Sequence, residues 1–396
     1  MDQNVSAGRL KPYAVVFGLP IGVPQVFAGI LLLAFFAECL WISIRTPLRT
    51  NEIAQIQQGQ LWLAHRSEEA DARSVLVPLL AAISVIGDGP NFADSSDAMT
   101  FRPTPRSWRW RARLPFVLIG LLLGASLWYV SRRLFGNPGG FIALTLYVFT
   151  PPLLQRSATV QPSIIAAWGA FGVIFTSIAV SHTLYAPREV VLWNWKRIML
   201  LGVSLALSIA AQPALVLLAP VGLAYLLYLV PERRRASLII FAAACALALV
   251  LLFALYRFHP ADLASTFTGF GWREFSPALF ARALTWSLLA IFFFRMPGVM
   301  LLLMLALIAY AAWKRPRYFG PTAALIVWAL LMIAGVVLPH LGGYNLFLVS
   351  LAFAYVFIAG VSADLLETHQ AGLVVGVLAG MILAHAMFSV LGLSRM

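Results

Sequence analysis

Glu52 is the residue whose type and position most suggest chemistry. It stands in the stretch Arg49-Thr50-Asn51-Glu52, directly after the first long apolar run of the chain. A carboxylate just outside a bilayer can accept a proton from a hydroxyl group or help to hold a divalent cation. Alternatively, it only favours a helix N-terminus through the macrodipole. The residues alone leave both interpretations open.

A short helix in the membrane interface is expected to position Glu52. The apolar residues that follow it have the spacing of an amphipathic helix: Ile53, Ile56, Leu61 and Trp62. Thr50 or Asn51 is predicted as the N-cap, and Gly59 lies near the end of the helix. The prediction holds Glu52 in the first helical turn, just outside the bilayer.

The composition predicts an all-α, polytopic membrane protein. Hydrophobic residues make up 61% of the 396 residues, charged residues make up 11%, and the mean hydropathy is +0.87. The apolar residues come in runs of roughly 17 to 25, the length that crosses a bilayer. A soluble helical protein would show polar faces at helical period, and stretches such as Leu238–Leu255 show none.

About eleven transmembrane helices are predicted in one integral domain, residues 1–396. The runs lie near residues 23–44, 114–132, 139–155, 160–182, 197–212, 213–230, 236–256, 297–314, 320–338, 343–362 and 371–393. The first extracytoplasmic loop, 45–113, is expected to contain interfacial helices, because Val75–Ile86 is apolar but too short to cross. The second outer segment, 257–296, is expected to carry an interfacial helix over Ser276–Phe294 and to cover the site with its first part, Arg257–Phe275.

Basic residues in the short loops predict a cytoplasmic N-terminus. The net charge of +13 does not indicate nucleic acid, because the arginines sit at span ends and in one loop. Four of them, Arg106, Arg109, Arg111 and Arg113, precede a span on the predicted outer side, against the usual bias. We therefore expect these arginines to bind something anionic, such as lipid headgroups or a lipid-linked phosphate.

Several short motifs occur in one order along residues 20–185. They are Asn51-Glu52 with Gly59, Val77-Pro78-Leu79-Leu80, Arg113-Leu114-Pro115, the segment 131–140, and Thr150-Pro151-Pro152 through Arg156. Together they resemble the polyprenol-phosphate-sugar-dependent glycosyltransferases of the GT-C fold, which include protein mannosyltransferases and aminoarabinose transferases. The resemblance implies inverting transfer of a sugar from a polyprenyl-phosphate donor to an acceptor at the extracytoplasmic face.

Two positions depart from the pattern that the resemblance implies. Asn51 stands where the family usually has the aspartate taken as the base, and Gln161 stands near a second family aspartate. An amide forms hydrogen bonds but is not a general base near neutral pH. Glu52 is therefore the candidate base, with Asn51 beside it and Gln161 as a candidate substrate-binding residue.

Candidate phosphate ligands follow from the same resemblance. Arg156, Arg273 and Arg295 are named because a guanidinium engages phosphate oxygens bidentately. His340 and Tyr344 lie in a turn where the family often has a basic motif with tyrosine. The alternatives are interfacial snorkelling for Arg156 and a structural role for His340.

The function predicted is therefore a membrane glycosyltransferase in a bacterial-type inner membrane. Its predicted partners are a polyprenyl-phosphate-linked sugar, membrane lipids and other membrane proteins, but not nucleic acid. No metal ligand is assigned; a divalent cation such as Mg²⁺ or Mn²⁺ is the cofactor considered. The alternative is a catalytically inactive GT-C-like subunit or scaffold, favoured by Asn51 and Gln161, and a transporter is disfavoured because no internal repeat is evident.

Overall fold

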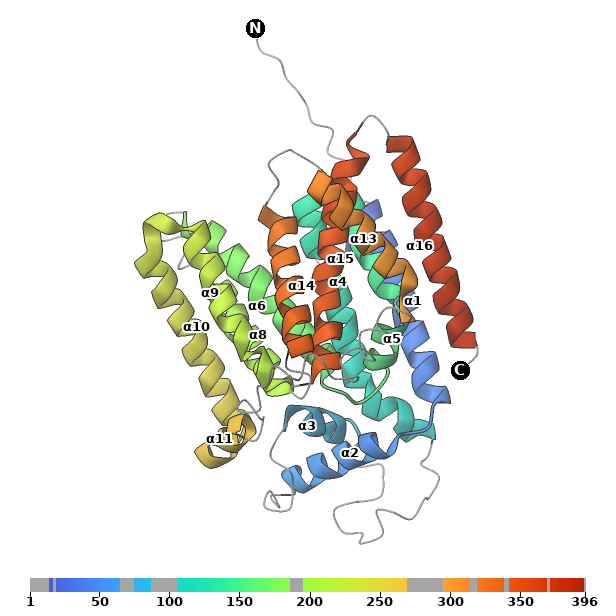
Figure 1. Cartoon of the computed structure of the whole chain (residues 1–396). Coiled ribbons are helices and arrows are strands. Elements are labelled where there is room, and N and C mark those ends of the chain that lie inside the picture. The colour runs from blue at the N-terminus through green and yellow to red at the C-terminus, as the bar shows by residue number, and fades with distance from the viewer. Residues whose placement is uncertain are drawn as a thin grey trace.

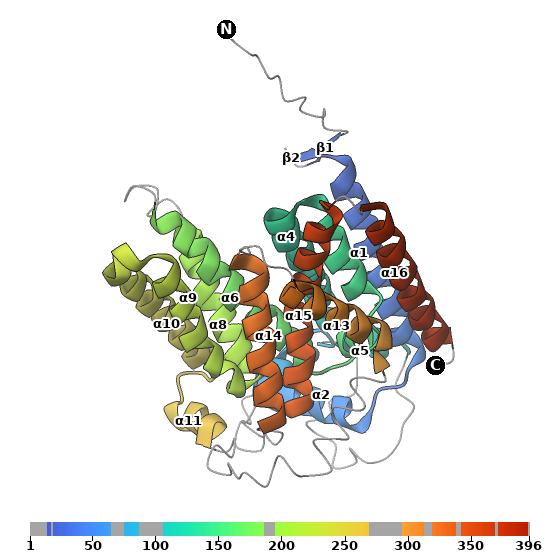
Figure 2. The same ribbon diagram turned by 45° about the horizontal axis from the view of Figure 1, so that its top comes forward.

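The structure is a computed structural model that describes residues 14–16, 19–64, 75–86, 106–185, 195–268, 295–312, 319–337, 342–368 and 371–394. In these ranges the chain is almost entirely helical, which confirms the predicted all-α class (Figure 1). A hairpin of two three-residue strands, β1 (Ala14–Val16) and β2 (Leu19–Ile21), precedes the first helix at one end of the bundle (Figure 2).

The helices follow the apolar runs of the sequence. They are α1 (Val23–Arg45), α2 (Thr50–Leu63), α3 (Leu76–Ile83), α4 (Arg106–Val148), α5 (Pro151–Ser157), α6 (Ser163–Leu184), α8 (Trp195–Ala211), the 3₁₀ helix η2 (Pro213–Leu217), α9 (Leu218–Leu229), the 3₁₀ helix η3 (Pro231–Arg233), α10 (Arg234–Leu255), α11 (Pro260–Thr268), α13 (Pro297–Ala312), α14 (Phe319–Val337), α15 (Gly343–Leu366) and α16 (Ala371–Ser394).

Seven of the described helices are long and apolar enough to cross a membrane, and two shorter apolar helices accompany them. This makes the chain a multi-pass membrane protein. The number of eleven crossings stays a prediction, because several of the expected spans form helices shorter than a full crossing.

Helix α4 is two antiparallel helices joined at Gly136. A straight helix of this length would measure about 65 Å, twice the thickness of the hydrocarbon core. Gly136 breaks it with φ 74° and ψ −174°, a conformation that favours glycine. The hydroxyl of Tyr147 donates to the Gly120 carbonyl at 2.7 Å, so the second arm runs back along the first. The predicted run 114–132 thus lies in the first arm, and the predicted run 139–155 is divided between the second arm and α5.

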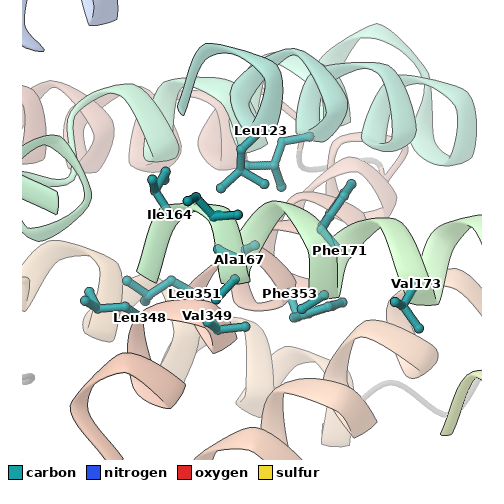
Figure 3. Packing of buried hydrophobic residues seen from close by; sticks show 14 of the residues in the cluster. Leu123, Ile164, Ala167, Phe171, Val173, Leu348, Val349, Leu351 and Phe353 are labelled. Carbon is teal, nitrogen blue, oxygen red and sulfur yellow. The ribbon is translucent and has the colours of Figure 1, made fainter. Parts of the chain in front are cut away.

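The core is centred on α6 and α15. Every residue in the most apolar stretch of α15 is buried, and α6 packs between α15 and α4. In Figure 3 the α6 side chains of Ile164, Ala167 and Phe171 lie between Leu123 of α4 and Val349 of α15. Such all-round burial explains why neither helix has a polar face.

Helices α2 and α3 lie across one end of the bundle, here called the α2 end (bottom of Figure 1). They pack closely at Gly59, where an added Cβ would come within 2.1 Å of the Pro78 carbonyl oxygen. Gly59 therefore permits the two backbones to touch. The expected short helix within Val75–Ile86 is present as α3, and the expected helix around Glu52 is present as α2. Its N-cap is Arg49, so the prediction of Thr50 or Asn51 as the N-cap was wrong; both residues already lie inside the helix.

The joint between α10 and α11 is fastened to α2 at the same end. Arg257 donates from Nη2 to the Trp62 carbonyl at 2.6 Å and lies over the Trp62 ring, which Tyr256 meets edge-on. Arg257 and Phe258 have φ of 52° and 61°, which is strained for non-glycine residues. The segment predicted as the second outer segment thus begins in contact with α2, although most of the predicted cover, and Ser276–Phe294, lie outside the described residues.

Candidate functional site

Glu52 is almost completely buried and forms an ion pair with Arg113. Its side chain is 1% exposed. The Arg113 guanidinium donates from Nε to Oε1 at 2.9 Å and from Nη2 to Oε2 at 2.6 Å. This bidentate arrangement is the strongest geometry available to a carboxylate and a guanidinium. It links the start of α2 to the start of the first arm of α4.

Arg113 also holds the connection between α1 and α2. Its Nη1 donates to the carbonyl oxygens of Ser43 and Thr46 at 3.0 and 2.8 Å, and its Nη2 donates to that of Pro47 at 3.0 Å. Arg113 is fully buried, so these bonds replace the water that the cation loses. The sequence motif contains Arg113, but its pairing with Glu52 was not predicted.

Two backbone N–H groups complete the surroundings of Glu52. Arg49 donates its amide to Oε2 at 2.9 Å, and Val160 donates its amide to Oε1 at 3.0 Å. Each carboxylate oxygen therefore accepts two hydrogen bonds. A general base needs a free lone pair within reach of its substrate. This geometry favours a positioning role for Glu52, and its role as base stays a prediction that requires one of these bonds to open.

Of the two amides that depart from the family pattern, Asn51 precedes Glu52 in the sequence, and Gln161 follows Val160, whose amide donates to Glu52. Asn51 is exposed on α2, while Gln161 is half-buried. Because the Val160 amide donates to Glu52, the fold brings the connection between α5 and α6, residues 158–162, to the start of α2.

Arg156, on α5, lies over the ring of Tyr344 at the start of α15. The guanidinium carbon is 4.9 Å from the ring centroid, within the range of a cation–π interaction. Burial lowers the pKa of Arg156 below its usual value, the neighbouring cations Arg49 and Arg295 act in the same direction, and a hydrogen bond to Tyr344 opposes them. Sequence reasoning named Arg156, Arg295 and Tyr344, and the structure brings them together.

Arg49, Arg156 and Arg295 form what we call the arginine cluster. No hydrogen bond or ion pair within the described residues joins the guanidinium of any of them to a carboxylate. Three neighbouring cations that have no acidic partner in the part of the chain that the structure describes favour an anion near them. Arg49 was missed from the sequence; the available signal was its place three residues before Glu52.

The described residues do not fit a divalent cation. They contain no group of three His, Cys, Asp or Glu side chains that could hold a metal ion. Glu52, the carboxylate of the site, already accepts four hydrogen bonds. Two of the predicted phosphate ligands, Arg273 and His340, lie outside the described residues.

Comparison with known proteins confirms the resemblance to GT-C glycosyltransferases. Residues 106–256 match the model of the dolichyl-phosphate-mannose-protein mannosyltransferase family. A search of curated protein sequences finds no match.

Two solved proteins share the fold. The Archaeoglobus fulgidus oligosaccharyltransferase in its apo form has a TM-score of 0.58 at 14% identity, over 92% of this chain and 55% of its own. ArnT from Cupriavidus metallidurans, bound to undecaprenyl phosphate, has a TM-score of 0.57 at 15% identity, over 89% of this chain and 62% of its own. The chain thus spans somewhat more than half the length of these proteins.

Proposed function

We propose that this chain is a membrane glycosyltransferase that moves a sugar from a polyprenyl-phosphate donor to an acceptor at the α2 end of the bundle. The fold supports this, because ArnT binds undecaprenyl phosphate and an oligosaccharyltransferase of the same fold binds dolichol phosphate. Neither the family match nor these neighbours favour an inactive scaffold subunit.

The observation that carries the proposal is the arginine cluster with Tyr344. A lipid-linked phosphate is an anion, and Arg156 lies on a short helix with its guanidinium over the ring of Tyr344. Guanidinium groups bind phosphate oxygens with two parallel hydrogen bonds. The cluster therefore fits the phosphate of the donor.

The chemistry assigned to the cluster is stabilisation of the leaving group. An acceptor oxygen forms a bond to the anomeric carbon of the sugar, the bond from that carbon to the phosphate oxygen breaks, and the phosphate leaves with the electron pair. Negative charge on the phosphate grows during this step, and fixed cations stabilise it most in the transition state. Arg49, Arg156 and Arg295 supply these cations.

The acceptor proton goes to a base, for which Glu52 remains the candidate. For Glu52 to accept it, the Arg49 or Val160 amide must release a carboxylate oxygen. Asn51 and Gln161 then orient the acceptor or the sugar through their amides. Arg273 and His340 are proposed as further phosphate ligands on the same grounds as before.

The membrane setting follows from the charge of the short loops. We place the chain in a bacterial-type inner membrane with a cytoplasmic N-terminus, so that the α2 end is extracytoplasmic. The arginines Arg132, Arg133, Arg233, Arg234 and Arg235 then lie in the cytoplasm. Cysteine labelling of loop positions on intact cells tests this orientation.

The direct test is transfer from polyprenyl-phosphate sugars by the purified chain. Wild type is compared with Arg156→Gln/Arg295→Gln and with the control Arg234→Gln/Arg235→Gln, which removes the same charge at the other end of the bundle. We expect loss of both undecaprenyl-phosphate binding and transfer only in the first variant. Unchanged undecaprenyl-phosphate binding in that variant would contradict the assignment of the arginine cluster as the phosphate site.

A further inference from the structure

The last described helix, α16, stands at the edge of the bundle (Figure 1). Only 11% of the residues in its most apolar stretch are buried, whereas all residues in the corresponding stretch of α15 are. His385, on α16, is nevertheless only 3% exposed. An ionisable side chain inside a membrane span is costly and commonly marks a functional site. The contacts of His385 therefore show what α16 contributes to the bundle.

His385 bonds a hydroxyl group that already joins two other helices. Its Nε2 lies 3.4 Å from Oγ1 of Thr150, the residue before α5. That hydroxyl donates to the Leu146 carbonyl of α4 at 2.6 Å and accepts from the hydroxyl of Tyr355, on α15, at 2.8 Å. A hydroxyl has one proton and two lone pairs, so its second lone pair accepts from the N–H at Nε2 of His385.

The other side of the His385 ring packs against α13. An added Cβ at Gly298, in the first turn of α13, would come within 3.2 Å of Cβ and Nδ1 of His385. Gly298 therefore permits a close approach of α13 to α16. Nδ1 has no hydrogen-bond partner among the described residues. The ring is thus held by a hydrogen bond on one side and by packing on the other.

The elements that meet at His385 are those that carry the arginine cluster and its aromatic neighbour. Arg156 lies six residues after Thr150, about 9 Å along α5. Arg295 lies three residues before Gly298, and Tyr344 lies in the first turn of α15. Their side chains lie together at the site. One imidazole therefore touches or bonds the supports of all three.

Helix α5 needs such support. It has seven residues, whereas an isolated helix shorter than about 12–15 residues is only marginally stable. The Thr150 hydroxyl does not cap α5, because it donates its proton to α4. The position of α5 thus depends on its packing and on what holds Thr150, and a shift at Thr150 would move Arg156 with it.

We propose that His385 is a positioning residue for the arginine cluster. Through Thr150 it holds α5, and against Gly298 it holds the start of α13, so that Arg156 and Arg295 stay within reach of one anion. Its effect on lipid-phosphate binding rests on the proposed function, but its effect on the two segments does not.

Hydrogen exchange of the full chain in detergent, followed by mass spectrometry, tests the effect on the segments. His385→Leu removes the donor and should speed exchange of the α5 amides roughly fivefold, the equivalent of one hydrogen bond. The first amides of α13, which lose only packing, should change less. His385→Gln can place an N–H near the position of Nε2 and should restore most of the protection.

Two further variants complete this experiment. Ser389→Ala is the matched control, because Ser389 lies one turn further along the buried side of α16 and its hydroxyl has no partner among the described residues. It should exchange like wild type. Thr150→Val keeps the shape of the side chain without its hydroxyl; it should show the same pattern as His385→Leu and serves if that variant fails to fold.

Titration with undecaprenyl phosphate tests the effect on binding. His385→Leu should bind about fivefold more weakly than wild type, and His385→Gln should recover most of the affinity. In an Arg156→Gln background, His385→Leu should weaken binding by a smaller factor, because no guanidinium remains at position 156 to be misplaced. A residue that only stabilised the fold would weaken binding by the same factor in both backgrounds.

The outcomes separate this proposal from the proposed function. Unchanged exchange in His385→Leu, faster exchange spread evenly over all helices, or an equal change in Ser389→Ala would overturn the positioning role. Equal factors in the two backgrounds would also overturn it. Absence of undecaprenyl-phosphate binding in wild type would contradict the proposed function, and exchange in α5 would still decide whether His385 holds the two segments.

Discussion

Arg113 and Glu52 form a bidentate ion pair across 61 residues of sequence, with distances of 2.9 and 2.6 Å, at the point where α1, α2 and α4 meet. Both side chains are 1% exposed or less. Because each charge is buried, its loss leaves the other without a partner. The structure of the α2 end therefore depends on both side chains.

Removing either partner should destabilise the protein. Glu52→Gln and Arg113→Gln each break a buried pair, which typically costs about 3–5 kcal/mol. The double variant should lose less than the sum of the single losses, because neither charge is then left unpaired. Thermal unfolding in detergent measures all three variants.

The same variants separate positioning from proton transfer. If Glu52 only positions the site, Arg113→Gln should lower transfer activity about as much as Glu52→Gln does, and unfolding temperature and activity should fall together. A stable Glu52→Gln protein with no transfer activity, beside an active Arg113→Gln protein, would instead identify Glu52 as the base.

Tyr344 should tune phosphate binding through its ring. Tyr344→Leu removes the surface over which Arg156 lies, and a cation–π contact is worth about 0.5–1 kcal/mol at such a site. We expect undecaprenyl-phosphate affinity to fall roughly two- to fivefold. Tyr344→Phe keeps the ring and should lose less, as measured by lipid titration. An equal loss in both variants would assign the effect to the hydroxyl group.

Gly59→Ala should separate α2 from α3. The new methyl group would meet the Pro78 carbonyl oxygen at 2.1 Å, and overpacking of this kind costs about 1–3 kcal/mol. Gly372→Ala on α16 is the matched control, because nothing lies within 4 Å of its added Cβ. It should leave the unfolding temperature unchanged or raise it slightly. Equal stability of the two variants would contradict the close approach.

The contact of α2 with the joint between α10 and α11 should weaken at alkaline pH. Burial raises the pKa of Tyr256 above its ordinary value of 10.0. The folded state thus favours the neutral phenol, so its stabilisation is complete below pH 10.0 and is lost as pH rises towards the raised pKa. Limited proteolysis of the joint across this range should show increasing cleavage in wild type. Tyr256→Phe should show a flatter profile.

The sequence predicts the elements of this protein better than their contacts. Apolar runs locate the helices because the bilayer demands a minimum length and internal hydrogen bonding. The same pattern does not show that Arg113 reaches Glu52, because the hydropathy of a span carries no information on the partner of a charge at its end. The order of the motifs placed both residues in the same family pattern, but only the structure showed the ion pair between them.

The arginine cluster illustrates the same limit. Arg156, Arg295 and Tyr344 were predicted as phosphate ligands from separate parts of the chain, and the fold places them together. Arg49 was missed because, in sequence, it resembles any basic residue that follows a span. Its proximity to Arg156 depends on how α5 packs beside α1, which no local pattern encodes.

The reversal of α4 at Gly136 sets the end of the bundle that α5 reaches. If α4 continued in one direction, α5 would begin at the end opposite α2, and Arg156 could never lie near Glu52. Because the chain turns back, the second arm returns it to the end from which Arg113 departs. One glycine with positive φ thus decides that both halves of the site meet at the α2 end.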